Sequence, residues 1–315
     1  MLRAFRGARS QEAFRRLLGR RSNVSHTWEN GHRFPSTLEF HRVAARVGVS
    51  PVEAWRTFLG GQSPPWLDDD FDLTDKPNLG RLLGQLHRAG SLAALCRGSG
   101  FTRHAAVRWL RGESAPRLPD LLRYVHATTQ RLADFAACWV DPEQLPSLTQ
   151  RWLRLEAART ALAQDPSAQL VRLAVELWPE TADRPPIGPW LAEQLGLEVP
   201  DVERCLELLV DSGQLARRGA GYVVTHGAPV TARASRVGTG LKARVSELGT
   251  ERVRAGDPEG LYSYAVFVVS DDDYEAARAI LAEAYERLRR LAAESTRSER
   301  LVAANLQLFP LVSVD

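Results

Sequence analysis

The chain has 315 residues, of which 44% are hydrophobic and 25% are charged, a composition typical of a soluble protein with more than one domain. No run approaches the roughly 20 apolar residues that span a bilayer, and the arginine-rich start lacks the apolar core of a signal peptide. We therefore expect a cytoplasmic protein. Its three cysteines, Cys96, Cys138 and Cys205, lie far apart without a metal-ligand pattern, so we expect them to be reduced, buried thiols.

The charge is distributed unevenly, although the net charge is only +3. Residues 1–60 contain eleven Arg and four acidic residues, and residues 79–140 contain nine Arg and three acidic residues. Residues 61–78, with five Asp and one Lys, have a net charge of −4, which leaves −6 for residues 141–315. A phosphate polymer attracts the basic segments and repels the acidic half, so this layout favours a nucleic-acid reader, although an Arg-rich composition alone gives similar counts.

The first sixty residues predict four short helices, over residues 10–18, 22–30, 36–47 and 50–58. Each begins at a serine that can cap its first turn, and glycines close the first three. Two short helices joined by a turn that contains glycine indicate a helix-turn-helix. The outward side chains of the second helix are short and able to form hydrogen bonds, as contacts with base edges require; they are Ser22, Asn23, His26 and Thr27.

This region resembles the phage-repressor-like (Cro and C1 type) helix-turn-helix family. The resemblance rests on the run SQEAFRRLLGRRSNVSHTWENGHRFPSTLEFHRVAARVGVSP, with Gln11, the turn Gly19, the closing Glu29-Asn30-Gly31 and Pro35. In that family the second motif helix lies in the major groove. The sequence departs from the family at Ser25, where an aliphatic residue is usual, and we expect Trp28 to fill that space.

The resemblance implies two sets of DNA contacts. Base contacts would be made by Gln11, Ser22, Asn23 and Thr27. Phosphate contacts would be made by Arg20, Arg21, Asn30 and Arg33. Dimers of this family bind half-sites about one helical turn apart, so the resemblance also implies a homodimer on double-stranded DNA.

Residues 79–140 predict a second, degenerate helix-turn-helix domain. Gly100 and Gly112 repeat the spacing of Gly19 and Gly31, and Trp109 occupies the place of Trp28. Its outward residues, Arg103, His104 and Arg108, form a second candidate DNA face, and packing against another domain is the alternative. Between the two domains we expect an acidic Pro/Gly linker over residues 61–78, and after the second a helical linker over residues 141–166.

Residues 167–226 fit a winged-helix-like pattern, with helices followed by a hairpin through Gly219 and Gly221. Acidic residues dominate the helix from Pro200 to Asp211, so we interpret this domain as a packing or dimerisation module. Residues 227–315 predict a small α+β domain for dimerisation or regulation, in which strands 261–269 and 301–308 flank a helix over 272–294.

The chain as a whole resembles an uncharacterised bacterial family that joins a repressor-like domain to a C-terminal domain of unknown function ending in a motif like LQLFPL, here Leu306–Leu311. We therefore expect a mainly α protein with two repressor-like five-helix domains, followed by the winged-helix-like and α+β domains. We expect it to act as a sequence-specific transcriptional regulator associated with the nucleoid. No catalytic or metal-ligand constellation stands out, so we expect no enzyme, cofactor or metal. The alternative is a nucleic-acid-binding or protein-interaction subunit of a larger complex, such as a defence complex, without promoter specificity.

Overall fold

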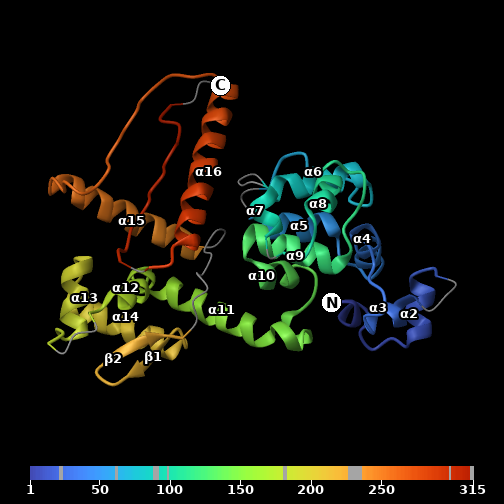
Figure 1. Cartoon of the computed structure of the whole chain (residues 1–315), viewed down its shortest axis with the longest axis horizontal. Coiled ribbons are helices and arrows are strands. Elements are labelled where there is room, and N and C mark those ends of the chain that lie inside the picture. Colours follow the sequence, from blue (N-terminus) through green and yellow to red (C-terminus); the bar gives the residue numbers. More distant parts are fainter. Residues whose placement is uncertain are drawn as a thin grey trace. The chain divides into compact units, whose positions relative to one another are not determined.

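A computed structural model describes residues 1–20, 24–60, 63–87, 92–97, 99–179, 183–225, 236–297 and 299–312. The chain is mainly helical and divides into two compact units, residues 1–152 and residues 153–315 (Figure 1). In the described residues, no helix combines the length and the apolar composition that a membrane crossing requires.

The N-terminal unit begins with a first repeat of short helices. They are α1 (Leu2–Arg6), α2 (Gln11–Leu17), α3 (Val24–Glu29), α4 (Thr37–Arg46) and α5 (Pro51–Leu59). The predicted serine caps are present where they are described: Ser10 accepts a hydrogen bond from the backbone of Ala13, and Ser36 forms a capping box with Glu39. The helices predicted between residues 10 and 58 are therefore found, and with α1 the described residues of the first repeat form five helices.

A second repeat follows with the same order of elements. It consists of α6 (Lys76–Leu86), α7 (Leu92–Cys96), α8 (Arg103–Leu110), α9 (Leu118–Thr129) and α10 (Leu132–Ala137). Equivalent glycines lie 81 positions apart and share a positive φ, which is 63° at Gly19, 79° at Gly100, 73° at Gly31 and 68° at Gly112. This backbone conformation favours glycine, so the glycine spacing in the sequence marks the ends of equivalent helices.

The two repeats share one hydrophobic core rather than forming two separate cores. The segment between them contributes to it, because Leu67 and Leu73 are both buried. Its acidic side chains stay at the surface, where Asp69 pairs with Arg56 of α5 at 2.6 Å. The acidic segment predicted as a linker thus packs against the core through its two leucines, which supply apolar surface to bury.

The C-terminal unit contains its own core, built mainly by helices that precede a hairpin. After the short 3-10 helix η2 (Pro142–Gln144), α11 (Pro146–Gln164) spans the boundary between the units. The elements that follow are α12 (Ala168–Ala174), η3 (Val175–Leu177), α13 (Ile187–Leu195), α14 (Val199–Asp211), β1 (Leu215–Arg218) and β2 (Gly221–Val224). The strands pair antiparallel, with Leu215 opposite Val224 and Arg218 opposite Gly221. A Cβ at Gly221 would overlap the Trp178 ring, which explains this glycine.

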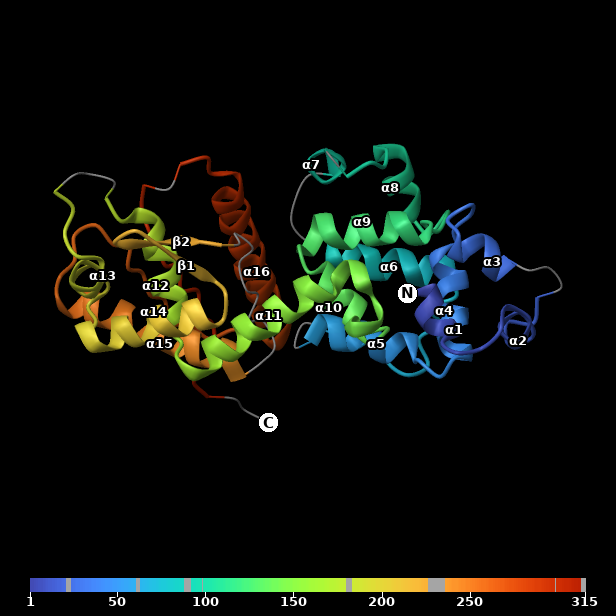
Figure 2. The same ribbon diagram turned by 90° about the horizontal axis from the view of Figure 1, so that it is seen from below.

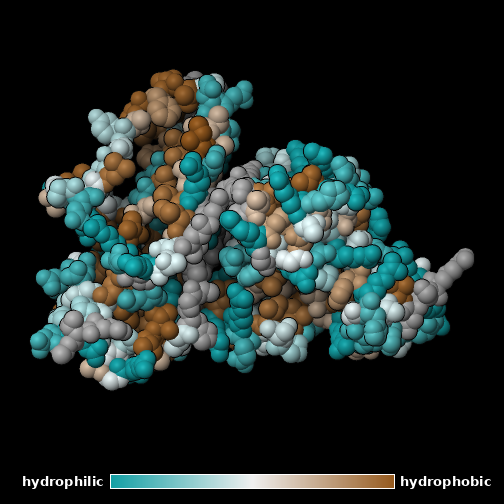
Figure 3. Space-filling model, viewed as in Figure 1, coloured by the Kyte–Doolittle hydropathy of each residue, from teal (hydrophilic) through white to brown (hydrophobic). Residues whose placement is uncertain are grey.

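The last two helices are α15 (Arg236–Arg254) and α16 (Asp271–Glu294), and Ser270 caps α16 by accepting a hydrogen bond from the Asp273 backbone. The strands expected at 261–269 and 301–308 are not formed, so the α+β prediction for residues 227–315 is corrected to helices joined by extended segments. A strand requires a hydrogen-bonded neighbour, and these segments have none among the described residues. Apolar side chains are consequently exposed on these segments and on α16, as Figure 3 shows for one face.

Candidate nucleic-acid interface

The helix predicted to read DNA, α3, packs through one side only. Trp28 and Ser25 are buried, and Trp28 joins Phe14 and Leu18 in the core. The turn that leads out of α2 passes through Gly19, where the positive φ reverses the chain. Figures 1 and 2 show α2 and α3 at the edge of the N-terminal unit, with α3 leading towards α4. The opposite side of α3 is therefore available for contact.

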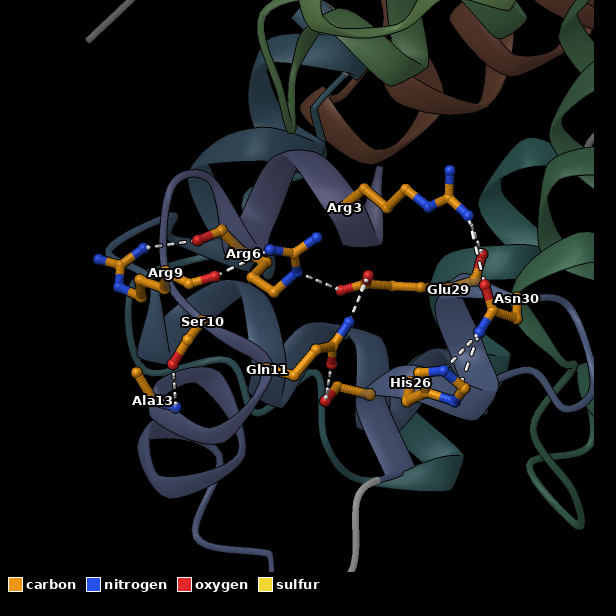
Figure 4. Close-up of polar contacts among 10 residues, drawn as sticks. Arg3, Arg6, Arg9, Ser10, Gln11, Ala13, His26, Glu29 and Asn30 are labelled. Carbon is orange, nitrogen blue, oxygen red and sulfur yellow. Dashed lines mark hydrogen bonds and ion pairs between the residues drawn. The ribbon is translucent and has the colours of Figure 1, made fainter.

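Glu29, at the end of α3, is the centre of a polar network beneath the helix (Figure 4). Its side chain is only 4% exposed, and its carboxylate accepts hydrogen bonds from Arg6 Nε and Gln11 Nε2, each at 2.8 Å. Arg3 donates to the Glu29 backbone carbonyl at 3.1 Å. One carboxylate thus ties α3 to both α1 and α2, which fixes the orientation of α3.

Gln11 uses both ends of its amide inside the domain. Its Nε2 donates to Glu29, and its Oε1 accepts a hydrogen bond from the Ser25 hydroxyl at 3.0 Å. Ser25, the departure from the family pattern, is therefore buried as a hydrogen-bonded partner of Gln11, while Trp28 fills adjacent core space as predicted. In this arrangement Gln11 positions α3, and it would have to break these bonds to contact DNA.

The outward side of α3 carries His26 and Asn30, which are exposed, and Thr27, which is half-buried. Asn30 lies 3.0 Å from His26 Nε2, and Arg3 donates to Asn30 at 3.5 Å. The Thr27 hydroxyl donates to the Val24 carbonyl at 2.7 Å. The predicted contact residues Arg21, Ser22 and Asn23 lie outside the described residues, directly before the first turn of α3.

A basic cleft of about 260 Å³ borders the turn between α2 and α3. Its lining includes Arg20, Arg42 and Arg46 and one acidic residue, Glu39, which pairs with Arg20 at 3.0 Å. Burial alone would raise the pKa of Glu39, but hydrogen bonds from Ser36 and the nearby Arg20 lower it overall, so Glu39 is ionised. The cleft nevertheless keeps an excess of positive charge.

Arg42 and Arg46 were missed in the sequence analysis. Their spacing of four residues places both on one face of α4, a signal that could have identified them once that helix was assigned. Arg46 also donates to the backbone carbonyl of Leu18, which anchors the turn. The predicted phosphate contact Arg33 is exposed in the loop after α3.

The second repeat presents an equivalent helix, α8, with different chemistry. Thr102 caps α8 by accepting a hydrogen bond from the Ala105 backbone at 3.2 Å, and Trp109 is buried as Trp28 is. Arg103 and His104 are exposed, and Arg108 lies 3.5 Å from Glu113. The three predicted residues of the second face are thus on the outward side of one helix.

In the described part of the second repeat, the polar network of the first repeat has no counterpart. Leu92 and Leu110 stand 81 positions after Gln11 and Glu29, and both pack against the shared core. Equivalent positions are therefore occupied by apolar side chains that pack against the core in one repeat and by hydrogen-bonded side chains in the other.

The surface of α14 in the C-terminal unit is acidic. Glu203, Glu207 and Asp211 are exposed, and Arg204 is paired with Asp201 at 2.8 Å and Asp165 at 3.3 Å. A phosphate backbone would be repelled by this surface. No group of three or more His, Cys, Asp or Glu side chains within the described part of the chain is arranged to hold a metal ion.

Comparison with protein families assigns the C-terminal half. Residues 151–311 match the family described as domain of unknown function (DUF4423), and the chain belongs to this family. No curated protein and no solved structure matches the chain. The matched region includes the terminal motif, in which Gln307 Nε2 donates to the Ser246 hydroxyl of α15 at 2.6 Å. Both candidate DNA-facing helices lie before the matched residues.

Proposed function

We propose that this protein is a sequence-specific DNA-binding transcriptional regulator that reads DNA through α3. The observation that carries the proposal is the buried carboxylate of Glu29, to which Arg6 of α1 and Gln11 of α2 donate, while Arg3 donates to the backbone carbonyl of the same residue. A buried ionised group is costly unless it is paired, and the second repeat has leucines at the two equivalent positions, 92 and 110. A helix held this firmly, with a polar outward side, suits base recognition, where small displacements weaken the contacts.

Within this proposal the residues have separate roles. Ser22, Asn23 and Thr27 contact base edges, together with His26, and Gln11 positions the helix. Phosphates are held by Arg20, Arg21, Asn30 and Arg33, and also by Arg42 and Arg46 of the basic cleft. Phosphate contacts set affinity and register, whereas base contacts set sequence preference.

The C-terminal half supplies regulation rather than DNA contact. The helices and hairpin of residues 167–226 follow a winged-helix-like order, but the helix that would enter a groove in such a domain, α14, presents acids. We assign residues 153–315 to pairing between chains or to sensing, in a protein that acts at the nucleoid.

The test is a selection of duplexes from a random library with the full chain, followed by salt titration of binding. We expect an enriched sequence, and affinity that falls steeply with salt because arginines displace counterions from phosphates. The variants His26→Ala and Thr27→Ala should reduce the preference for the selected duplex over a scrambled one by about 1–3 kcal/mol, while Arg46→Ala should weaken both duplexes alike.

Arg287→Ala is the matched control, because Arg287 is an exposed arginine on α16, away from both repeats in the sequence. It should leave binding unchanged. Equal affinity for all duplexes would support the alternative of a nucleic-acid-binding subunit without promoter specificity. No binding to duplex DNA at low salt would refute the proposal.

A further inference from the structure

The two repeats meet through a reciprocal backbone contact, which we call the seam, between residues 35–37 and residues 116–118. The Thr37 N–H donates to the Pro116 carbonyl at 2.8 Å, and the Leu118 N–H donates to the Pro35 carbonyl at 2.9 Å. Ser36 and Arg117 thus form an antiparallel bridge. Ser36 is therefore paired with its own equivalent, 81 positions away. Thr37 bonds to Pro116, the equivalent of Pro35, and Leu118, the equivalent of Thr37, bonds to Pro35 in return. Reciprocal contacts between equivalent residues characterise a two-fold relationship.

Side chains from both repeats extend the contact beyond the seam. Trp55 of α5 lies 5.0 Å from the ring of Phe135 in α10, and Phe58 lies 5.2 Å from the same ring. Phe58 and Trp139 are equivalent residues, and Trp139 packs 4.7 Å from Phe40 of α4. The bond from Arg131 to the Phe58 carbonyl, at 3.0 Å, adds a polar contact. The two repeats are therefore fixed to each other by a continuous core.

A two-fold rotation leaves the height of any atom along the axis unchanged. Equivalent helices must therefore lie at the same level along that axis, and α3 and α8 are equivalent. Figures 1 and 2 show α3 and α8 apart from each other, with α4 and α9 nearer the middle of the N-terminal unit. This is the arrangement by which two copies of a helix-turn-helix protein place paired helices against one duplex.

The two outward faces differ in chemistry. In the described residues, α3 offers His26 and Thr27 to base edges, whereas α8 offers Arg103, His104 and Arg108. Arginine favours guanine, through its O6 and N7 acceptors, whereas threonine accepts several bases through its hydroxyl or contacts the thymine methyl group. A pair of helices with such different side chains would prefer two half-sites of different sequence.

We propose that a single chain carries both half-site readers, α3 and α8, and occupies one DNA site made of two unlike half-sites about one helical turn apart. This inference rests on the proposed function and adds the form of its DNA partner. Where the family resemblance implies a homodimer to supply the second reader, the second repeat supplies it here within one chain.

The experiment uses the full chain and the duplex enriched by selection. Native mass spectrometry gives the number of chains per duplex, and hydroxyl-radical footprinting gives the protected positions. Two double variants remove one reader each. His26→Ala/Thr27→Ala changes α3, and Arg103→Ala/Arg108→Ala changes α8. Arg287→Ala is the control. A duplex with about five extra base pairs between the half-sites, half a helical turn, tests the rigid connection.

We expect one chain for each pair of protected half-sites. Each double variant should lose protection at one half-site only, and the two double variants should lose it at different half-sites. The five-base-pair insertion should weaken wild-type binding about tenfold or more, because the core prevents α8 from following its half-site. Two outcomes would overturn this inference and leave the proposed function standing. In the first, the α8 double variant protects the selected duplex as the wild type does. In the second, two chains are required to protect one pair of half-sites. Failure of the wild-type chain to enrich any duplex would overturn both.

Discussion

The guanidinium of Arg6 lies 2.8 Å from the carboxylate of Glu29, and this contact joins the first helix of the chain to the end of α3. Gln11 completes the site from α2 at the same distance. Three elements that are separate in the sequence thus converge on one buried oxygen pair.

Replacement of Glu29 by leucine should destabilise the N-terminal unit by about 2 kcal/mol, because it leaves the Gln11 amide buried without an acceptor. The second repeat folds with an apolar pair in this place, because Leu92 and Leu110 occupy the positions equivalent to Gln11 and Glu29. The double variant Gln11→Leu/Glu29→Leu should therefore recover part of the loss. Chemical denaturation of all three variants, including Gln11→Leu alone, gives the coupling energy. Additive losses in the double variant would contradict the assignment of Gln11 and Glu29 as one unit.

Gly80 and Gly84 lie one turn apart on α6 and should respond to alanine in opposite directions. A Cβ at Gly80 would lie 2.8 Å from the backbone nitrogen of Gly112, whereas nothing lies within 4 Å of a Cβ at Gly84. Gly80→Ala should lower the melting temperature by forcing α6 away from the turn after α8. Gly84→Ala should raise stability by about 0.5–1 kcal/mol through helix propensity. Calorimetry of both variants checks the close approach between Gly80 and Gly112. An equal rise of the melting temperature in both variants would exclude that approach.

His41 should make the N-terminal unit sensitive to acid. It is fully buried, with Nδ1 donating to the Leu73 carbonyl at 2.8 Å and Nε2 accepting from Trp55 at 3.1 Å, and burial lowers its pKa to about 4. The unfolded chain, with a pKa of about 6.5, binds a proton more readily than the folded chain. Stability contributed by neutral His41 is therefore complete above pH 6.5 and is lost as the pH falls towards 4.

The loss amounts to about 3 kcal/mol over this interval. Urea denaturation from pH 7 to pH 4 measures this loss. The variant His41→Gln removes the titrating group, and its amide can still donate one hydrogen bond and accept another. The variant should be less stable at pH 7 and should show a shallower decline with acid. An unchanged slope would assign the acid sensitivity to other groups.

The thiols of Cys138 and Cys205 should resist alkylation in the folded protein. Burial raises the pKa of Cys205 to about 12, and Asp165 adds to the effect, while burial and Asp134 raise the pKa of Cys138 to about 11. The thiolate is the reactive form, so iodoacetamide at pH 8 should label neither residue until denaturant is added. Mass spectrometry of labelled peptides checks this. Rapid labelling of Cys205 in native buffer would show that the core of the C-terminal unit opens readily.

Much of the fold could be predicted from local signals. Ser10, Gly19, Gly31 and Ser36 mark helix ends through capping and through positive φ, and both effects depend only on neighbouring residues. The repeat at residues 79–140 followed from the same glycines. The shared core could not be predicted, because the partners of Trp55 and Phe58 lie about eighty residues away, where no local pattern reports on pairing.

The failures have equally specific causes. The segment 261–269 has the β-branched and aromatic composition of a strand, but composition cannot supply the neighbouring strand that its backbone needs. The use of Gln11 was also beyond the sequence, since an amide at a helix start can face DNA or its own domain. In the structure the buried Ser25 hydroxyl gives the Gln11 Oε1 a partner inside the domain, a contact that no local sequence pattern reports.

The seam between Ser36 and Arg117 also bears on how this protein could change over time. In a pair of identical subunits, every substitution appears twice, so neither half can alter without the other. Here the two halves are separate segments of one polypeptide, so each can accept substitutions of its own. The covalent connection keeps the two halves together. The carboxylate and amide of one half and the two leucines at the equivalent positions of the other half are a difference that identical subunits could not have.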